Sequence, residues 1–307
     1  MSFVLVTTGG DITGENVKAY EWMVKYTPQV EWIEKRGIFL WLAFFFGGIG
    51  SGLYLTSLWL NSLAGMFIGW LIVLILKGAA HLAFLGQPWR FWRAVLRPQT
   101  SWISRGLIAI VLFGFFGALQ FIFAYWLPGN SAELVFKVIS AVMAVGVAMY
   151  TGFTLACLTG VPFWNNGLLP VLFLACGITG GLGLALGMAL VGIEMPLEAV
   201  ETGAQFMLLV FPVLLLIYLW SAANAMPAGK ASVKELIQGS AVTWFWGGLI
   251  VCGIVIPGIV AAYGLFRGEV SHPLLFLSVV GEVVGGLSLR YCILKVGIYS
   301  PLIPLRS

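Results

Sequence analysis

Residues 37–60 read GIFLWLAFFFGGIGSGLYLTSLWL, and this stretch contains no charged side chain. A helix needs about 20 consecutive apolar residues to cross the hydrocarbon core of a bilayer, so the stretch is long enough to span one. Lipid cannot hydrogen-bond to backbone N–H and C=O groups, whereas a helix satisfies those groups within itself. The stretch therefore predicts a transmembrane helix.

The rest of the sequence repeats this pattern. Hydrophobic residues make up 60% of the 307 residues and charged residues only 9%, compared with about 25% charged residues in an ordinary soluble domain. This composition excludes a soluble enzyme, a disordered protein and a nucleic-acid-binding domain. We predict an all-α integral membrane protein whose eight transmembrane helices form two four-helix bundles. The expected helices cover residues 37–60, 63–85, 106–127, 133–159, 168–193, 204–222, 240–266 and 273–298.

The protein divides into three expected parts. Residues 1–36 mix aromatic and charged residues and lack the apolar core of a signal peptide, which predicts an interfacial or partner-contacting segment. Residues 37–160 would hold the first four-helix bundle, with the candidates for a functional site. Residues 161–307 would hold the second bundle and a C-terminal tail.

Basic residues are distributed unevenly between the two sides of the membrane. Eight spans put both termini on one side, where eleven Lys or Arg residues lie, whereas the opposite loops contain Arg267 alone. Cytoplasmic loops are enriched in Lys and Arg. We therefore expect a multi-pass protein of the cell (inner) membrane with both termini in the cytoplasm. The eleven residues are Lys18, Lys25, Lys35, Arg36, Arg90, Arg93, Arg97, Arg105, Lys230, Lys234 and Arg306.

Ionisable residues inside a membrane span are costly and therefore indicate a function. Lys77 and His81 are four residues apart, which puts them on one face of a helix. Glu282 lies near the middle of the last span, and Arg290 follows it by about two helical turns. Lys77, Glu282 and Arg290 are candidates for a proton path. A structural ion pair between Glu282 and Arg290 is the alternative.

The sequence offers no set of ligands for a metal cofactor. A b-type haem needs axial ligands at matching depth, but His81 and His272, the two histidines, are expected at opposite membrane surfaces. The four cysteines form no CxxC pair, which argues against an iron–sulfur cluster or a zinc site. We expect no haem, no iron–sulfur cluster and no other metal in this protein.

Two further stretches indicate a function. Residues 86–106 read GQPWRFWRAVLRPQTSWISRG and combine four Arg with three Trp. These residue types dominate interface energetics, so the loop predicts a docking surface; a belt of aromatic and basic residues at the membrane interface is the alternative. Tyr150 lies inside the end of the fourth span, where its hydroxyl needs a hydrogen-bond partner. A tyrosine satisfied within the core is the alternative there.

Motifs in both stretches occur in a characteristic order. They comprise Gly86, Pro88, Arg90, Trp92, Ser101 and Ser104 to Gly106, and then Tyr150, Gly152, Pro162, Trp164, Asn165, Pro170 and Phe173. In these features the sequence resembles the NrfD-like family, the membrane subunits of polysulfide reductase and related molybdenum or tungsten oxidoreductases. The resemblance covers residues 37–190. Many members have an acidic residue where this sequence has Phe84 and a basic one where it has Gln87, so the family's proton-handling residues do not transfer.

The resemblance implies an eight-helix subunit without haem that binds a quinone, either menaquinone or ubiquinone, in the lipid membrane. It also implies a ferredoxin-like iron–sulfur subunit as partner, which connects to a catalytic subunit with a molybdopterin-type cofactor. Tyr150 matches the family's quinone hydrogen-bond donor. We place the quinone site at Tyr150, His81, Lys77, Trp102 and Arg105. We place partner docking at Arg90, Trp92, Arg93, Arg97 and Trp164.

We therefore predict the membrane anchor of a respiratory oxidoreductase complex, which exchanges electrons between quinone and an iron–sulfur partner. The protein would not be catalytic alone, and proton translocation is an optional addition. A secondary transporter of a small solute or ion is one alternative, favoured by the glycine-rich stretches GGIGSG (47–52) and GITGGLG (177–183). A purely structural membrane anchor is the other.

Overall fold

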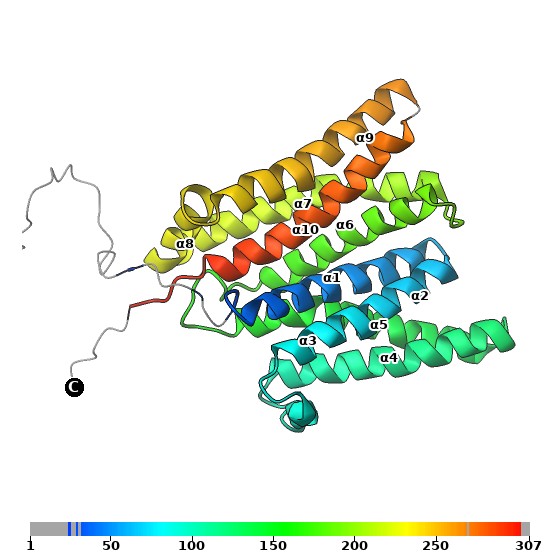
Figure 1. The fold of residues 1–307 in the computed structure, drawn as a ribbon, viewed down its shortest axis with the longest axis horizontal. Coiled ribbons are helices and arrows are strands. Elements are labelled where there is room, and N and C mark those ends of the chain that lie inside the picture. Colours follow the sequence, from blue (N-terminus) through cyan, green and yellow to red (C-terminus); the bar gives the residue numbers. More distant parts are fainter. Residues whose placement is uncertain (1–23, 26–28, 30–31, 269, 302–307) are drawn as a thin grey trace, which may run out of the picture.

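The computed structural model describes residues 24–25, 29, 32–268 and 270–301, and the regular secondary structure of these residues is entirely helical. Eight helices are long and apolar enough to cross a membrane, and they run roughly parallel to one long axis (Figure 1). The predicted all-α membrane fold is thus confirmed. The spans are α1 (Gly37–Trp59), α2–η2–α3 (Leu63–Phe84), α4 (Trp102–Trp126), α5 (Ser131–Ala156), α6 (Leu169–Leu190), α7 (Leu197–Ala225), η4–α9 (Trp244–Arg267) and α10 (His272–Lys295).

Successive spans alternate in direction. The beginning of α1 and the end of α10 lie at the same end of the bundle, on the left of Figure 1. We call this end the terminus side and the other end the opposite side. Accordingly α3 and α5 end at the terminus side, whereas α7 and α10 begin at the opposite side.

The centre of the bundle is formed by α1 and α6, which are the most buried of the eight spans. A Cβ atom added at Gly52 would lie 1.8 Å from the carbonyl oxygen of Gly177, and one at Gly181 would lie 2.3 Å from the carbonyl carbon of Gly52. Only glycine allows two helix backbones to approach this closely. The stretches GGIGSG and GITGGLG therefore pack directly on each other. We call this contact, formed by Gly48, Gly52, Gly177 and Gly181, the glycine crossing.

The other helices surround this centre. α1 also packs against α2, η2, α3 and α5, and α6 packs against α5, α7 and α10. α4 lies on α5, and η4 lies on α10. The helices before and after residue 160 therefore meet mainly through α1, α5 and α6, while the division into two domains stays a prediction.

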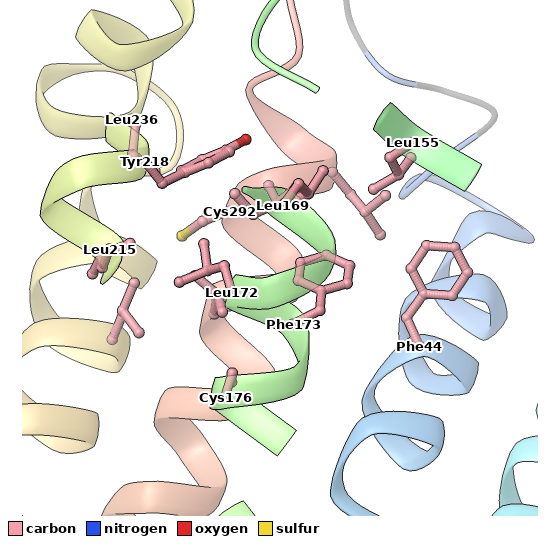
Figure 2. Close-up of a cluster of buried hydrophobic side chains, with 14 of the residues drawn as sticks. Phe44, Leu155, Leu169, Leu172, Phe173, Cys176, Leu215, Tyr218, Leu236 and Cys292 are labelled. Carbon is pink, nitrogen blue, oxygen red and sulfur yellow. The ribbon is translucent and has the colours of Figure 1, made fainter. Parts of the chain in front are cut away.

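A buried cluster of apolar side chains packs between α1, α6, α7 and α10. Figure 2 shows Phe44 of α1, Leu172 and Phe173 of α6, and Cys292 of α10 between the helices, together with residues of α7. In a membrane such packing is driven by close contact rather than by the hydrophobic effect. The Tyr218 hydroxyl at the edge of the cluster donates to the carbonyl of Phe163 over 2.6 Å, so this buried polar group is satisfied.

Both α4 and α7 begin several residues before the predicted start of the span. α4 begins at Trp102, earlier than residue 106, because the Ser101 hydroxyl accepts a hydrogen bond from the Ser104 N–H over 3.3 Å and caps the helix. α7 runs from Leu197 to Ala225 instead of 204–222. Its first turns contain Glu198 and Glu201, and such polar residues interrupt an apolar run without interrupting a helix.

Two short helices were not predicted. The 3-10 helix η3 (Pro88–Leu96) lies in the Arg- and Trp-rich loop, and α8 (Pro227–Gln238) follows α7. Both are less apolar and shorter than a membrane span, so the hydropathy pattern gave no signal for them.

Most of the predicted interfacial segment, residues 1–36, lies outside the described residues. Its described part packs on the terminus side of the bundle. Trp32 meets Trp164 edge-on with 5.1 Å between ring centroids, and Glu34 forms an ion pair with Lys295 over 3.0 Å. The Gln29 side-chain amide donates to the carbonyl of Gly297. These contacts tie the segment to the C-terminal end of α10.

Candidate functional site

Three residues predicted for the quinone site meet near the terminus side of the bundle. The Tyr150 hydroxyl lies 3.1 Å from His81 Nε2, which is hydrogen-bonding distance. Lys77 Nζ lies 4.8 Å from the centroid of the Tyr150 ring, in a cation–π arrangement. The same ammonium group donates to the carbonyl of Ala43 over 3.1 Å. The structure therefore brings Tyr150, His81 and Lys77 into one cluster, which we call the Tyr150 cluster.

Local helix geometry explains this arrangement. Lys77 and His81 lie one turn apart on the same face of the second span. Lys77 is the last residue of η2 (Ile72–Lys77), a π-helical segment, and such segments occur frequently at functional sites. The position of Lys77 on a π-helical segment therefore agrees with a functional role of the cluster.

Two glycines make room for the cluster. A Cβ atom at Gly106 of α4 would lie 2.0 Å from Tyr150 Cδ2, and one at Gly47 of α1 would lie 2.6 Å from Lys77 Nζ. Any larger side chain at these positions would displace the tyrosine ring or the ammonium group. Glycines of α1 and α4 are therefore needed for the observed positions of Lys77 and Tyr150.

The polar groups of the cluster are enclosed, and His81 Nδ1 is buried without a hydrogen-bond partner among the described residues. Lys77 is 1% exposed and Tyr150 is 6% exposed, whereas His81 is half-buried. Tyr150 lies six residues before the end of α5, which corresponds to about 9 Å along the helix. A hydroxyl donor, an imidazole and an ammonium group thus lie together in the leaflet of the terminus side. Such groups can bind a carbonyl oxygen and exchange a proton with it.

Trp102 and Arg105 line the neighbouring surface of α4. The Trp102 ring stacks on Phe153 of α5 with 4.2 Å between centroids, one helical turn from Tyr150. Arg105 packs over the Trp102 ring at 4.5 Å, and its guanidinium donates to the carbonyls of Pro98 and Gln99 over 2.7 and 2.8 Å. Arg105 is therefore held by the loop before α4, and it makes no hydrogen bond to the Tyr150 cluster within the described residues.

Arg290 lies deep between α1, α6 and α10. Its guanidinium donates to the carbonyls of Phe44 and Gly286, both over 3.0 Å, and to Cys176 Sγ over 3.2 Å. A Cβ atom at Gly48 would lie 1.9 Å from its terminal nitrogen. Lys77 and Arg290 thus approach α1 and donate to consecutive carbonyls, those of Ala43 and Phe44.

Glu282 stands apart from both cations. It is 4% exposed, and its Oε2 atom has no hydrogen-bond partner among the described residues. No ion pair joins it to Arg290 in the described part of the protein, and Arg290 lies about 12 Å farther along α10. The alternative interpretation, a structural Glu282–Arg290 ion pair, is therefore wrong. The predicted proton path of Lys77, Arg290 and Glu282 is not joined by direct hydrogen bonds and stays a prediction.

The predicted docking residues divide into two groups. Arg90, Trp92, Arg93 and Arg97 are exposed, and η3 contains no buried residue. Trp164 is fully buried, and its indole N–H donates to the carbonyl of Ile293 over 2.6 Å. The structure thus gives Trp164 a position in the core instead of the surface position that we expected, because its ring fills the space beside Gly297.

One buried polar contact was missed by the sequence reasoning. The Tyr54 hydroxyl of α1 donates to the side-chain oxygen of Gln120 of α4, and the Gln120 amide lies 3.5 Å from Met66 Sδ. Gln120 is fully buried. The signal was an uncharged amide in an apolar run, which a search for ionisable residues does not detect.

Comparison with known proteins identifies the family. The family model described as polysulphide reductase, NrfD, matches residues 29–301. The protein belongs to the NrfD family. Protein NrfD of Escherichia coli (strain K12) is 30% identical to this NrfD-family protein over 73% of the sequence and 79% of the relative.

Two other relatives extend this result. A protein NrfD homolog of Haemophilus influenzae is 26% identical, over 89% of this sequence and 96% of its own length. The C subunit of polysulfide reductase from Wolinella succinogenes is 30% identical, over 52% of this sequence and 53% of its own length. The predicted family is thus confirmed. With its eight apolar helices, this NrfD-family member is a multi-pass membrane protein.

Proposed function

We propose that this NrfD-family protein is the membrane anchor of a respiratory oxidoreductase complex and exchanges electrons between the quinone pool and an iron–sulfur partner subunit. The Tyr150 cluster is the observation that carries this proposal. One relative is named as a single component of polysulfide reductase. This name supports assembly into a multi-subunit complex, and the partners that we propose are a ferredoxin-like iron–sulfur subunit and a molybdopterin-type catalytic subunit.

The residues of the cluster suit a quinone headgroup. A bound quinone, menaquinone or ubiquinone, supplies two-electron chemistry that is coupled to two protons. Tyr150 donates a hydrogen bond to a carbonyl oxygen, and His81, whose Nε2 lies 3.1 Å from the Tyr150 hydroxyl, exchanges the proton. The Lys77 ammonium, fixed by the Ala43 carbonyl at 3.1 Å, favours negative charge on the headgroup. Trp102 and Phe153 form an aromatic wall beside it.

The position of the cluster determines where the partner binds. With two histidines and no CxxC motif, the protein lacks ligand sets for a cofactor that would carry electrons across the membrane. The partner's cluster must then lie at the terminus side, near Tyr150. The exposed aromatic and arginine side chains of η3 lie at this side and supply the docking surface. The excess of Lys and Arg in the loops of this side supports our proposal that it faces the cytoplasm.

The decisive variant is Tyr150→Phe in the purified complex. It removes the hydroxyl and keeps the ring, so the complex assembles normally. We expect quinol turnover to fall at least about tenfold, as for the loss of one hydrogen bond that stabilises developing charge. Tyr218→Phe is the matched control, since this buried tyrosine donates to the Phe163 carbonyl, away from the cluster. Equal turnover in both variants removes Tyr150 from the site.

A further inference from the structure

A cavity opens between α7, α9 and α10 at the end of the bundle opposite the Tyr150 cluster. Its volume is about 270 Å³. The polar groups that line it are Glu198, Glu201, Thr202 and Gln205 of α7, and Ser278 and Glu282 of α10.

The polar residues of α7 form a track that leads inward. Glu198 lies in the first turn and is exposed, Glu201 is half-buried one turn deeper, and Gln205 follows after another turn. This spacing keeps the three side chains on one face of the helix. Residues of α6 and α9 line the rest of the cavity with apolar side chains and glycine. The track therefore connects the membrane surface with the buried interior.

Glu282 lies on the opposite wall of this cavity from the track. Its exposure is 4%, and a Cβ atom at Gly183 would lie 2.4 Å from its Oε2. Within the described part of the protein no donor reaches that oxygen. A buried carboxylate without a donor or counter-ion is strongly unfavourable. The group therefore requires a cation, which can be a proton bound to it or a metal ion beside it.

We propose that Glu282 binds a small monovalent cation, a proton or Na⁺, which enters from the opposite side of the membrane along the Glu198–Glu201–Gln205 track. The polar side-chain atoms of the cavity include carboxylate, hydroxyl and amide oxygens, which are the ligands of hard cations. The other ionisable groups of the lining, Glu198 and Glu201, are acidic and attract a cation.

No Lys or Arg side chain of the described residues lines the cavity as a counter-ion for Glu282. Arg267 ends α9 but does not line the cavity. The Arg290 guanidinium donates its hydrogen bonds to the carbonyls of Phe44 and Gly286 and to Cys176 Sγ instead. The proposal goes beyond quinone chemistry and stands without it, because cation binding at Glu282 involves no redox step.

Labelling with dicyclohexylcarbodiimide tests this site in the purified, fully assembled protein. The reagent modifies protonated carboxyl groups in apolar surroundings, and mass spectrometry of a digest locates the adduct. We expect an adduct on Glu282 that is lost in Glu282→Gln. Glu133 lies in the first turn of α5, where its carboxylate accepts a hydrogen bond from the Gly129 N–H over 3.3 Å. It serves as an internal reference in the same digest and is expected to stay unmodified.

The dependence of Glu282 labelling on pH and on Na⁺ distinguishes a bound proton from a bound Na⁺ ion. Labelling that decreases as pH rises and is indifferent to Na⁺ supports an exchangeable proton. Protection by Na⁺ at fixed pH, with no protection by choline, supports a Na⁺ site. The proposal is overturned by the absence of an adduct at Glu282 at every pH, or by an adduct that neither pH nor Na⁺ affects.

A second variant, which keeps the Glu282 carboxylate, tests whether the cation enters along the α7 track. Gln205→Leu should slow labelling of Glu282, because it makes the inner end of the track apolar. Asn224→Leu exchanges an amide on the same helix outside the cavity and should leave labelling unchanged. Equal rates in the two variants contradict entry along α7. None of these measurements uses a quinone, so their outcome is separate from that of Tyr150→Phe.

Discussion

At Gly106, a hydrogen atom in place of a side chain determines where the Tyr150 ring can lie. Gly106→Ala would put a methyl group 2.0 Å from Tyr150 Cδ2, so the ring must move and its hydroxyl must leave His81. Misplacement of a catalytic group by about 1 Å can cost about a hundredfold in rate. We expect quinol turnover of the complex to fall at least about tenfold.

The neighbouring Gly146→Ala is the control for this prediction. It adds the same methyl group to the α4–α5 interface, but at an ordinary contact distance of 3.5 Å from Ala109 Cβ. Both variants should assemble to the same level. A Gly106→Ala complex as active as the Gly146→Ala complex would show that the ring position does not matter for turnover.

The composition of the Tyr150 cluster was predictable at the residue scale, but its surroundings were not. A lysine and a histidine four apart in an apolar span identify a helix face, and a tyrosine near a helix end requires a partner. The sequence does not show that Gly47 and Gly106 make room for them, nor that Trp164 lies in the core. Those features depend on which helices pack together, and hydropathy carries no information about helix neighbours.

At the scale of elements, the glycine crossing between α1 and α6 sets the stability of the bundle. Gly52→Ala would put a methyl group 1.8 Å from the Gly177 carbonyl oxygen, and this backbone atom cannot rotate away. We expect a loss of about 1–3 kcal/mol, the usual cost of overpacking, or failure to fold. Thermal unfolding in detergent measures the effect. Gly258→Ala on α9, where no atom lies within 4 Å, should be neutral or slightly stabilising.

Most helices were predictable because about 20 apolar residues leave little choice in a membrane. The exceptions follow from the same physics. The first turns of α7 are polar because they line a cavity instead of facing lipid, and α8 and η3 are too short and too polar to span. Residue polarity excluded these segments from the predicted spans, but it did not predict that they are helical.

At the scale of the whole molecule, the exposed arginines of η3 lie on the same side as the Tyr150 cluster. If the arginines of η3 dock an acidic surface of the partner, Arg93→Glu should weaken assembly of the complex. The defect should grow as salt is lowered, because the new carboxylate and the acidic surface repel each other. Co-purification of the partner subunits at several salt concentrations measures this. Lys234→Glu makes the same charge change on α8, also exposed at the terminus side. Equal assembly in both variants would assign η3 to the lipid interface instead.

The glycine crossing also has an electrical consequence. The Tyr150 cluster and the Glu282 cavity lie in opposite leaflets, and the two backbones that separate them touch so closely that no file of water molecules fits between them along this contact. The contact between α1 and α6 therefore offers no water-filled route for a charge. A charge that passes from one leaflet to the other along this contact must be handed over by side chains, and Arg290, held beside the crossing through Phe44 and Cys176, adds a fixed positive barrier on the way.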